Sequence, residues 1–579
     1  MPRLPRSFFP IAAIVAFLVL GFGLFCSTGH DDSHITYWAA HSLQKLGQIY
    51  NYNGERVEQS SSLAHVLILA VLGAVTHIQL PTLGPLTSIL AGIAAILLVA
   101  RLARLAAPDA PRGLELLVGT AECFIHWGFG GLETTIVAAA AVWVVYECAR
   151  YLDAPSSLGL VRAGLAMMLY VTARPESPLV LACILAAALA YVALRRHRFG
   201  KPAGALLAVV RPPLTLAVIA AAECALLFAF RRKYFGLNFP NPVYSKVPGL
   251  SILDGLTYIG TGLFPAALWV LPGVFYGVRH VIRRARTDEA PQFAAVLSAA
   301  FVIAYLAFIV LVGGDWMKGA RFFAHAFPLL AVVTILGIQS RITNPRWAQR
   351  TVGILVAMNV AGTVLLAFTS SNGRPIWTTP GLRAQADALS GARGESWFEL
   401  TNVVHLRDIP VTATMLDLVH EIREKDPNRK VVIMSTQAGM VTYHVAVANY
   451  GAIRFLDTCS LATRDFLTCP TAYEILDDTR YGMTLSLETY FGNAAKLERA
   501  CGTPRPDIVF TVVPKRDGPI LKENGYTIVY DQRGPIRGEQ QSGRRSADIF
   551  LSDQLVAVDS KLFKSLGLKK KDRYTWNIR

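Results

Sequence analysis

The sequence predicts a polytopic α-helical membrane protein with an α/β domain at its C-terminal end, and three observations support this fold class. The chain has 579 residues, of which 53% are hydrophobic and only 17% charged, whereas soluble domains carry about 25% charged residues. Long apolar runs recur throughout residues 1–371. Beyond residue 372, short β-rich segments alternate with helical ones. We therefore expect a membrane domain over 1–371 and an extracytoplasmic domain over 372–579.

The formal net charge of +16 does not indicate a nucleic-acid partner. Most of the arginines fall in short loops between apolar runs, and no basic-aromatic platform for nucleic acid is present in the sequence. Cytoplasmic loops of membrane proteins carry an excess of Lys and Arg. The charge therefore predicts the orientation of the helices and no nucleic-acid binding.

Twelve apolar runs are candidate membrane spans. They cover residues 8–27, 62–78, 84–105, 113–128, 131–149, 157–173, 177–194, 205–230, 255–278, 291–312, 321–340 and 351–370. The first run follows Arg3 and Arg6 and has no clear small-x-small cleavage signal after it. We therefore expect a retained helix with the N-terminus in the cytoplasm.

The run 62–78 decides the number of spans. If it crosses the membrane, the basic loops that follow it fall outside, against the positive-inside rule. If it lies along the outer interface or re-enters, five basic loops fall inside, and they contain Arg101, Arg150, Arg195, Arg279 and Arg341. We therefore predict about eleven transmembrane helices, with an outer loop over 28–83 that contains interfacial helices and with the C-terminus outside. Twelve spans with an inverted charge pattern is the alternative.

The C-terminal region predicts a small α/β domain, because three β-rich segments alternate with helical stretches such as 414–425. The β-rich segments are 430–434, 507–513 and 526–530. The turn 435–439 joins a strand to a helix, where backbone amides can meet a polar ligand, and an ordinary turn is the alternative.

Some polar residues of this domain are candidates for further roles. Asp457, Tyr443 and His444 are candidate contacts for an acceptor. Cys459 and Cys469 are candidates for a disulfide outside the cytoplasm, which would leave Cys501 unpaired.

The adjacent carboxylates Asp31 and Asp32 follow the first apolar run directly. Carboxylates at the membrane edge are costly unless they face water or do chemistry. They are candidates for a catalytic base, and the first turn of an interfacial helix is the alternative. With His34 or His30 they could also hold a divalent cation such as Mg, Mn or Ca, although no cofactor is firmly indicated.

Other polar and aromatic residues fall on the same predicted outer side. They are Trp127, Glu133, Arg174, Arg232, Tyr234, Asn241, Tyr244, Lys246, Asp315, Trp316 and Arg321. Because the positive-inside rule disfavours cations outside, the arginines and lysine need another reason to be there. A phosphate diester of a lipid in the outer leaflet supplies one.

Five motifs in order resemble the GT-C glycosyltransferases of bacteria, and most closely the polyprenyl-phosphate arabinofuranosyltransferases, including those of mycobacteria. They span about the first 325 residues and are Asp31-Asp32-x-x-Ile35 with Gly54 to Glu58, Gly131 to Thr134, Arg174-Pro175-Glu176, Tyr234 to Lys246, and Gly313 to Phe322. The sequence departs from the family pattern at Gln59 to Ser62, at Ser177 and at Pro242, which bears on the sugar and the acceptor more than on the reaction.

The resemblance implies a GT-C-like fold in a bacterial inner membrane, with the active site on the periplasmic face. It implies transfer of a sugar, with D-arabinofuranose as the first choice, from polyprenyl phosphate to a hydroxyl of a glycan, a pilin or other surface protein, or a lipid. Within it, Asp31 or Asp32 takes the acceptor proton. The leaving phosphate is held by cations, for which the candidates are Lys246, Arg232, Arg321 and Arg174.

The remaining outer residues are candidates for contacts with the sugar or the lipid, namely Tyr234, Tyr244, Asn241, Trp127, Trp316, Glu133 and Asp315. Structural alternatives are a helix cap for Glu133, a salt bridge of Arg174 with Glu176, and an ion pair of Asp315 with Arg321. Transfer of mannose or an aminosugar is an alternative function. A transporter or flippase is a more distant one, because no convincing internal repeat is found and the charges cluster at the outer helix ends.

Overall fold

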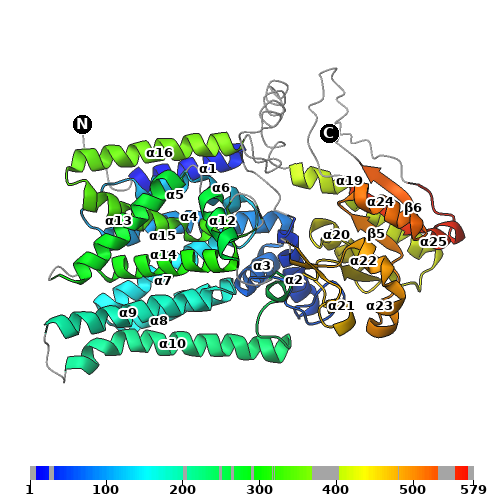
Figure 1. The fold of residues 1–579 in the computed structure, drawn as a ribbon, viewed down its shortest axis with the longest axis horizontal. Helices are drawn as coiled ribbons and strands as arrows, with labels where there is room; N and C mark the ends of the chain where they lie inside the picture. Colours follow the sequence, from blue (N-terminus) through cyan, green and yellow to red (C-terminus); the bar gives the residue numbers. More distant parts are fainter. Residues whose placement is uncertain are drawn as a thin grey trace, which may run out of the picture.

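The computed structural model describes residues 8–24, 31–199, 205–246, 251–262, 266–287, 292–315, 317, 320–367, 403–479, 482–532 and 554–570. Within these residues it has a bundle of long helices and a separate α/β domain at one end of the bundle, with helix α2 and its neighbour α3 between them (Figure 1). The helices of the membrane part are α1 (Phe8–Leu24), α2 (Ser33–Leu46), α3 (Leu63–Thr76), α4 (Leu80–Ala106), α5 (Leu114–Gly119), α6 (Glu122–Phe129), α7 (Thr134–Asp153), α8 (Ser157–Ala173), α9 (Ser177–Phe199), α10 (Ala205–Tyr234), α11 (Asn241–Lys246), α12 (Ile252–Gly262), α13 (Ala267–Ala285), α14 (Phe293–Val312), α15 (Arg321–Arg341) and α16 (Pro345–Ala367).

Six of the described helices are long and apolar enough to cross a membrane, namely α4, α7, α9, α10, α14 and α15. Helix α15 is buried along almost its whole length, so it lies at the centre of the bundle. Helices α1, α3 and α8 are apolar but shorter. The prediction of a polytopic α-helical membrane protein is therefore confirmed.

Two of the predicted spans do not form single helices. The run 113–128 is divided into α5 and α6, and the run 255–278 is divided into α12 and α13. Helix α3, within the run 62–78, has 14 residues, which cover about 21 Å at 1.5 Å per residue and are shorter than the hydrocarbon core. This length suits a helix that does not cross, and the number of eleven spans stays a prediction.

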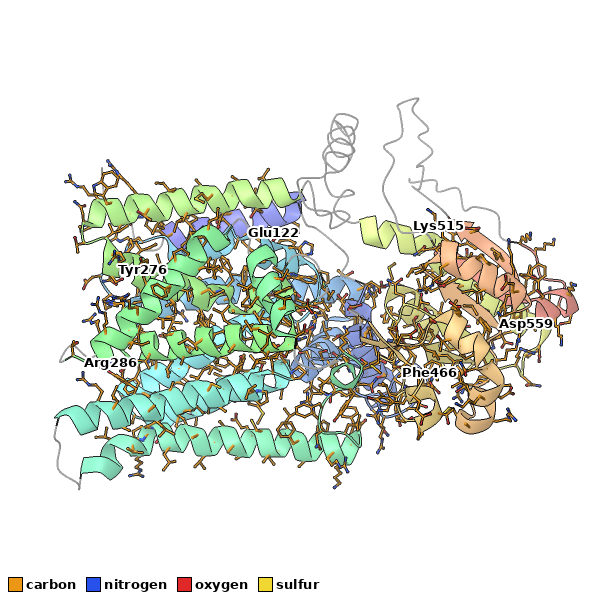
Figure 2. The ribbon with its side chains drawn as sticks, viewed as in Figure 1. Glu122, Tyr276, Arg286, Phe466, Lys515 and Asp559 are labelled. Atoms are coloured by element: carbon orange, nitrogen blue, oxygen red, sulfur yellow. A yellow bond between two sulfur atoms is a disulfide. The ribbon has the colours of Figure 1, made fainter. Side chains whose placement is uncertain are left out.

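Two of the five predicted basic loops lie together at one end of the bundle. Arg286 and Tyr276 lie at the end of the bundle far from the α/β domain (Figure 2). At that end Arg195 donates to the carbonyl of Thr287 at 2.9 Å, which joins two of the basic loops. The opposite end adjoins the α/β domain and carries the predicted site residues. Which end faces the cytoplasm stays a prediction.

The α/β domain has a five-stranded sheet in the order β2-β1-β5-β7-β6. Strands β1 (Val431–Ser435), β2 (Ile453–Asp457) and β5 (Ile508–Thr511) are parallel, whereas β7 (Gln554–Asp559) is antiparallel to β5 and to β6 (Tyr526–Gln532). The three predicted β-rich segments therefore form β1, β5 and β6, and the predicted helix 414–425 forms the end of α19 (Val403–Lys425).

Smaller elements complete the domain. They are α20 (Met440–Asn449), α21 (Pro470–Tyr473), the hairpin of β3 (Asp477–Thr479) and β4 (Gly482–Thr484), α22 (Leu487–Gly492), α23 (Ala494–Cys501), α24 (Pro514–Glu523) and α25 (Ser560–Ser565). The predicted pairing of Cys459 with Cys469 is wrong, because Cys469 forms a disulfide with Cys501. Cys459 instead lies in the buried turn after β2, where burial, with Asp457 nearby, raises the pKa of its thiol to about 12.

Candidate functional site

A cavity of about 480 Å³ lies where the helix ends next to the α/β domain meet the loop after α2 and that domain. Its lining combines charged, hydroxyl and apolar side chains from distant parts of the chain. The lining residues used below are Asp32, Thr36, Gln59, Ser60, Ser61, Glu133, Arg174, Glu176, Lys246, Asp254, Asp315, Arg321 and Leu461. Six residues predicted from sequence thus line one cavity: Asp32, Glu133, Arg174, Lys246, Asp315 and Arg321.

One part of the lining, which we term the loop wall, consists of Asp32, Thr36, Gln59, Ser60 and Ser61. Asp32 precedes α2 and makes no capping hydrogen bond with its side chain. Thr36 lies one turn further along the same helix face, and its Oγ1 lies 2.8 Å from Oγ of Ser60. The amide of Gln59 donates to the carbonyl of Ile35 at 2.7 Å. These bonds tie the loop to the helix that carries Asp32.

Lys246 reaches the cavity from the last turn of the short helix α11. The first residue of this helix, Asn241, fixes its place: the backbone N–H donates to the carbonyl of Glu58 at 2.8 Å. The Asn241 side chain donates to the carbonyls of Ser460 and Leu461 at 2.7 and 2.9 Å. Asn241 therefore holds α11 against the loop and the α/β domain, and it does not line the cavity.

The second part of the lining, the ion-pair wall, consists of Glu133, Arg174, Glu176, Asp315 and Arg321. Arg174 donates to Glu133 at 2.7 Å and to Glu176 at 3.0 Å, and all three side chains are buried. Pro175 accounts for the position of Arg174, because a residue before proline is pushed into extended backbone and α8 ends there. The salt bridge of Arg174 with Glu176 that sequence offered as an alternative is thus present, whereas Glu133 lies at the N-cap position of α7 without a capping hydrogen bond from its side chain.

The same wall continues to a second pair at the start of α15. Arg321 donates to Asp315 at 2.6 Å and lies over the ring of the buried Trp127, 5.9 Å from its centroid. Gly313 and Gly314 have φ of 81° and 83°, so the turn before this pair needs residues without a Cβ. The ion pair that sequence offered as an alternative for Asp315 is present.

The arginines of this wall affect the ionisation of Glu133. Burial acts to raise the pKa of Glu133, but Arg174 and then Arg321 outweigh it and leave the pKa of this carboxyl below its ordinary value. Behind the wall, the hydroxyl of Tyr305 lies 3.5 Å from Glu176 and 2.5 Å from Nδ1 of His325. The wall is thus an ordered network and not a set of independent charges.

The structure places the side chains of the adjacent residues Asp31 and Asp32 in different environments. Its side chain is buried and accepts a hydrogen bond from the backbone N–H of Met440 at 2.7 Å. Asp31 therefore contacts the first residue of α20 in the α/β domain, and it does not line the cavity. The turn 435–439, predicted as a place where amides can meet a polar ligand, leads into this contact.

Several other predicted residues do not line the cavity. Arg232 is exposed and donates to the carbonyl of Gly236 at 3.1 Å. Tyr234 accepts from the N–H of Ile49 at 2.9 Å, and Tyr244 is exposed on α11. Trp316 and His30 lie outside the described residues.

The candidate contacts in the α/β domain also have structural partners. Tyr443 and His444 pack against the ring of His34, with centroids 5.4 and 5.9 Å apart. The buried carboxylate of Asp457 accepts from the backbone N–H groups of Cys459, Leu461 and Ala462. These residues join the two domains or order the turn that carries Leu461 to the cavity.

The described residues that were proposed for a divalent cation are Asp31, Asp32 and His34. In the part of the chain that the structure describes, no group of three or more His, Cys, Asp or Glu side chains is placed to hold an ion. Asp31 binds the N–H of Met440, and His34 lies against Tyr37 and Tyr443. We therefore derive no step through a metal.

Sequence reasoning missed several residues around the cavity. Gln59, Ser60 and Ser61 line it, although sequence marked them only as a departure from the family pattern. Asp254 lines it beside Ser251, whose hydroxyl donates to its carboxylate, and the Ser-x-x-Asp spacing was an available signal.

Arg231 and Glu58 form a buried pair that sequence also missed. Arg231 has no exposed surface and donates to both oxygens of Glu58 at 2.9 to 3.2 Å. The pair fastens the loop before Gln59 to the C-terminal end of α10.

The fold is shared with solved membrane proteins. The sequence matches no family model and no curated protein. The crystal structure of ArnT from Cupriavidus metallidurans in the apo state aligns with a TM-score of 0.53 at 13% identity, over 96% of this chain and 98% of that chain. The crystal structure of the same protein bound to undecaprenyl phosphate gives 0.52 at 14%, over 96% and 97%. A likeness at this identity shows the fold alone, and the chain has the GT-C fold that its motifs predicted.

Proposed function

We propose that the protein transfers a sugar from a polyprenyl-phosphate carrier to an acceptor hydroxyl, with D-arabinofuranose as the first choice of sugar. The observation that carries the proposal is the single cavity that brings Asp32 together with Lys246, Arg174 and Arg321. A carboxylate and several cations in one enclosure suit a reaction that removes a proton at one place and releases a phosphate at another.

The roles follow from the charges. Asp32 takes the proton of the acceptor hydroxyl as its oxygen bonds to the anomeric carbon. The bond from that carbon to the phosphate oxygen breaks, and polyprenyl phosphate leaves with the electron pair. Lys246 is our first candidate for the cation that stabilises the leaving phosphate, and Arg174 and Arg321 on the same cavity are the next. The sugar contacts Glu133 and Asp315, whereas Trp127 does not line the cavity.

The fold supports this reaction over transport, although a flippase remains the contrasting class. The solved neighbour in complex is bound to undecaprenyl phosphate, and we propose the same class of carrier here. We further propose a bacterial inner membrane, a cavity that opens on the periplasmic face, and an acceptor on a glycan, surface protein or lipid of the cell envelope.

A second candidate substrate is a carrier with an aminosugar. Among the described lining residues, five are carboxylates (Asp32, Glu133, Glu176, Asp254 and Asp315) and three are cations (Arg174, Lys246 and Arg321). An excess of carboxylates favours a cationic sugar next to the anionic phosphate. No comparable observation favours mannose.

The test measures release of polyprenyl phosphate by the purified full-length protein. Decaprenyl-phosphate arabinofuranose and an undecaprenyl-phosphate aminosugar are supplied as separate donors, each with a cell-envelope extract that provides acceptor hydroxyls. We expect turnover with one of them and a loss of about 10²- to 10⁴-fold in Asp32→Asn. The control is Asp109→Asn, an exposed aspartate in the turn after α4. Release of no carrier from either donor, or full turnover in Asp32→Asn, contradicts the proposal.

A further inference from the structure

The carboxylate of Asp31 is held by the α/β domain at the point where the chain enters the cavity. Its Oδ1 accepts the N–H of Met440 at 2.7 Å, and Met440 is the first residue of the ten-residue helix α20. A carboxylate is favoured at a helix N-terminus by the unsatisfied N–H groups and by the helix dipole. The membrane domain thus supplies the cap that α20 lacks in its own sequence, since Gly439 has no side chain to cap it.

Gly439 makes this approach possible. A Cβ at this position would overlap all three atoms of the Asp31 carboxylate. Glycine therefore leaves the space that the Asp31 carboxylate occupies.

Neighbouring contacts seat the same segment. The hydroxyl of Tyr52 donates to the carbonyl of Ala438 at 2.9 Å. The side chain of Asn53 donates to the carbonyl of Phe455 and accepts from its N–H, at 2.9 and 2.7 Å. The loop after α2 is thus bonded to the loop before α20 through Tyr52 and to strand β2 through Asn53.

Asp32 is the next residue in the chain and lines the cavity. We infer that Asp31, Gly439 and Met440 form an interdomain latch, whose role is to position Asp32 as the base. The inference deepens the proposed function and rests on it. Asp31 is then a positioning residue, and the α/β domain contributes to turnover through its seating on the membrane domain.

Substitution at Asp31 separates this role from catalysis. Asn retains an oxygen that accepts the N–H of Met440, whereas Ala retains none. We expect Asp31→Asn to keep most of the turnover and Asp31→Ala to lose about ten- to a hundredfold in kcat, with a smaller change in the KM of the donor. A loss in Asp31→Asn as deep as in Asp32→Asn would show that Asp31 is a base and would overturn the inference.

Substitution at Gly439 tests the latch from the other domain. Gly439→Ala forces the carboxylate away, whereas the control Gly492→Ala meets nothing within 4 Å. Hydrogen–deuterium exchange of the full-length protein reports seating without any substrate. We expect Gly439→Ala to raise exchange in peptides over 31–46 and 436–449 and to lower kcat, and Gly492→Ala to do neither.

The double variant Asp31→Ala/Gly439→Ala measures how far the effects of the two substitutions on kcat depend on each other. Removal of the carboxylate removes the overlap, so we expect the double variant to be no slower than Asp31→Ala alone. If hydrogen–deuterium exchange in Gly439→Ala equals that in Gly492→Ala, the latch does not exist. If exchange is raised but kcat is unchanged, the latch exists but does not position Asp32. Absence of turnover in the wild type would contradict the proposed function instead. The exchange comparison would still test the contact between the domains, because it needs no substrate.

Discussion

The two parts of the cavity lining are held in place in different ways. In the ion-pair wall, every charged side chain already has a partner of opposite charge, and all come from helix ends or their turns. In the loop wall, Asp32 has no such ion pair among the described residues, and its neighbours are hydroxyl and amide groups. The first wall maintains its own geometry, whereas the second depends on α2, α11 and the α/β domain.

Because of this difference, we expect substitutions in the two walls to affect different properties, namely stability and turnover. A buried network of charges is costly to break, because removal of one partner leaves the others uncompensated. A carboxylate without an ion pair is available to accept a proton. We therefore expect changes in the ion-pair wall to act first on stability and changes at Asp32 or Lys246 to act on the reaction.

The largest effect on stability is expected for Arg174→Ala. This change leaves the buried carboxylates of Glu133 and Glu176 without their arginine, at a cost of about 3–5 kcal/mol. The thermal midpoint in detergent should fall strongly. The control is His420→Ala, which removes a largely exposed contact with Glu424 and should cost about 0–1 kcal/mol. Equal midpoints for the two variants would contradict the division between the walls.

A smaller effect is expected for Lys246→Ala, which we measure as its affinity for undecaprenyl phosphate. Loss of one charge-assisted hydrogen bond to a phosphate corresponds to about a tenfold weaker affinity for undecaprenyl phosphate. Native mass spectrometry of the protein–lipid complex measures it. Arg232→Ala is the matched control, because Arg232 is also a cation near the outer helix ends but does not line the cavity. An equal loss in both variants would place the phosphate elsewhere.

The comparison also shows what can be predicted from the sequence. Apolar runs and loop charges predicted the membrane class and the end of the bundle that carries the site, because both depend on local composition. Spacing of β-rich segments predicted three strands of the sheet. The break between α5 and α6 was missed, because an apolar run does not reveal where the chain leaves a helix.

Contacts between residues that are far apart in the sequence could not be predicted. Asp31 and Asp32 are adjacent and chemically identical, and only the position of Met440, 409 residues along the chain from Asp31, distinguishes them. The same holds for Arg231, whose partner Glu58 is 173 residues away. Composition supplied the kinds of group at the site, and the fold decided which of them reach the cavity.

The smallest expected effect is a dependence of stability on pH in the ion-pair wall. Because Arg174 and Arg321 lower the pKa of Glu133 in the folded state, its ionised form stabilises the fold. This contribution is present above the unfolded pKa of about 4.3 and is lost as the pH falls through the lower folded value. We expect the advantage of the wild type over Glu133→Gln in thermal midpoint to be constant from pH 8 to 5 and to shrink below about pH 4. Each pKa unit of the shift corresponds to about 1.4 kcal/mol. An advantage that grows as the pH falls would mean that the carboxyl is stabilised in its protonated form, and the ion-pair wall would then not be held together by charge.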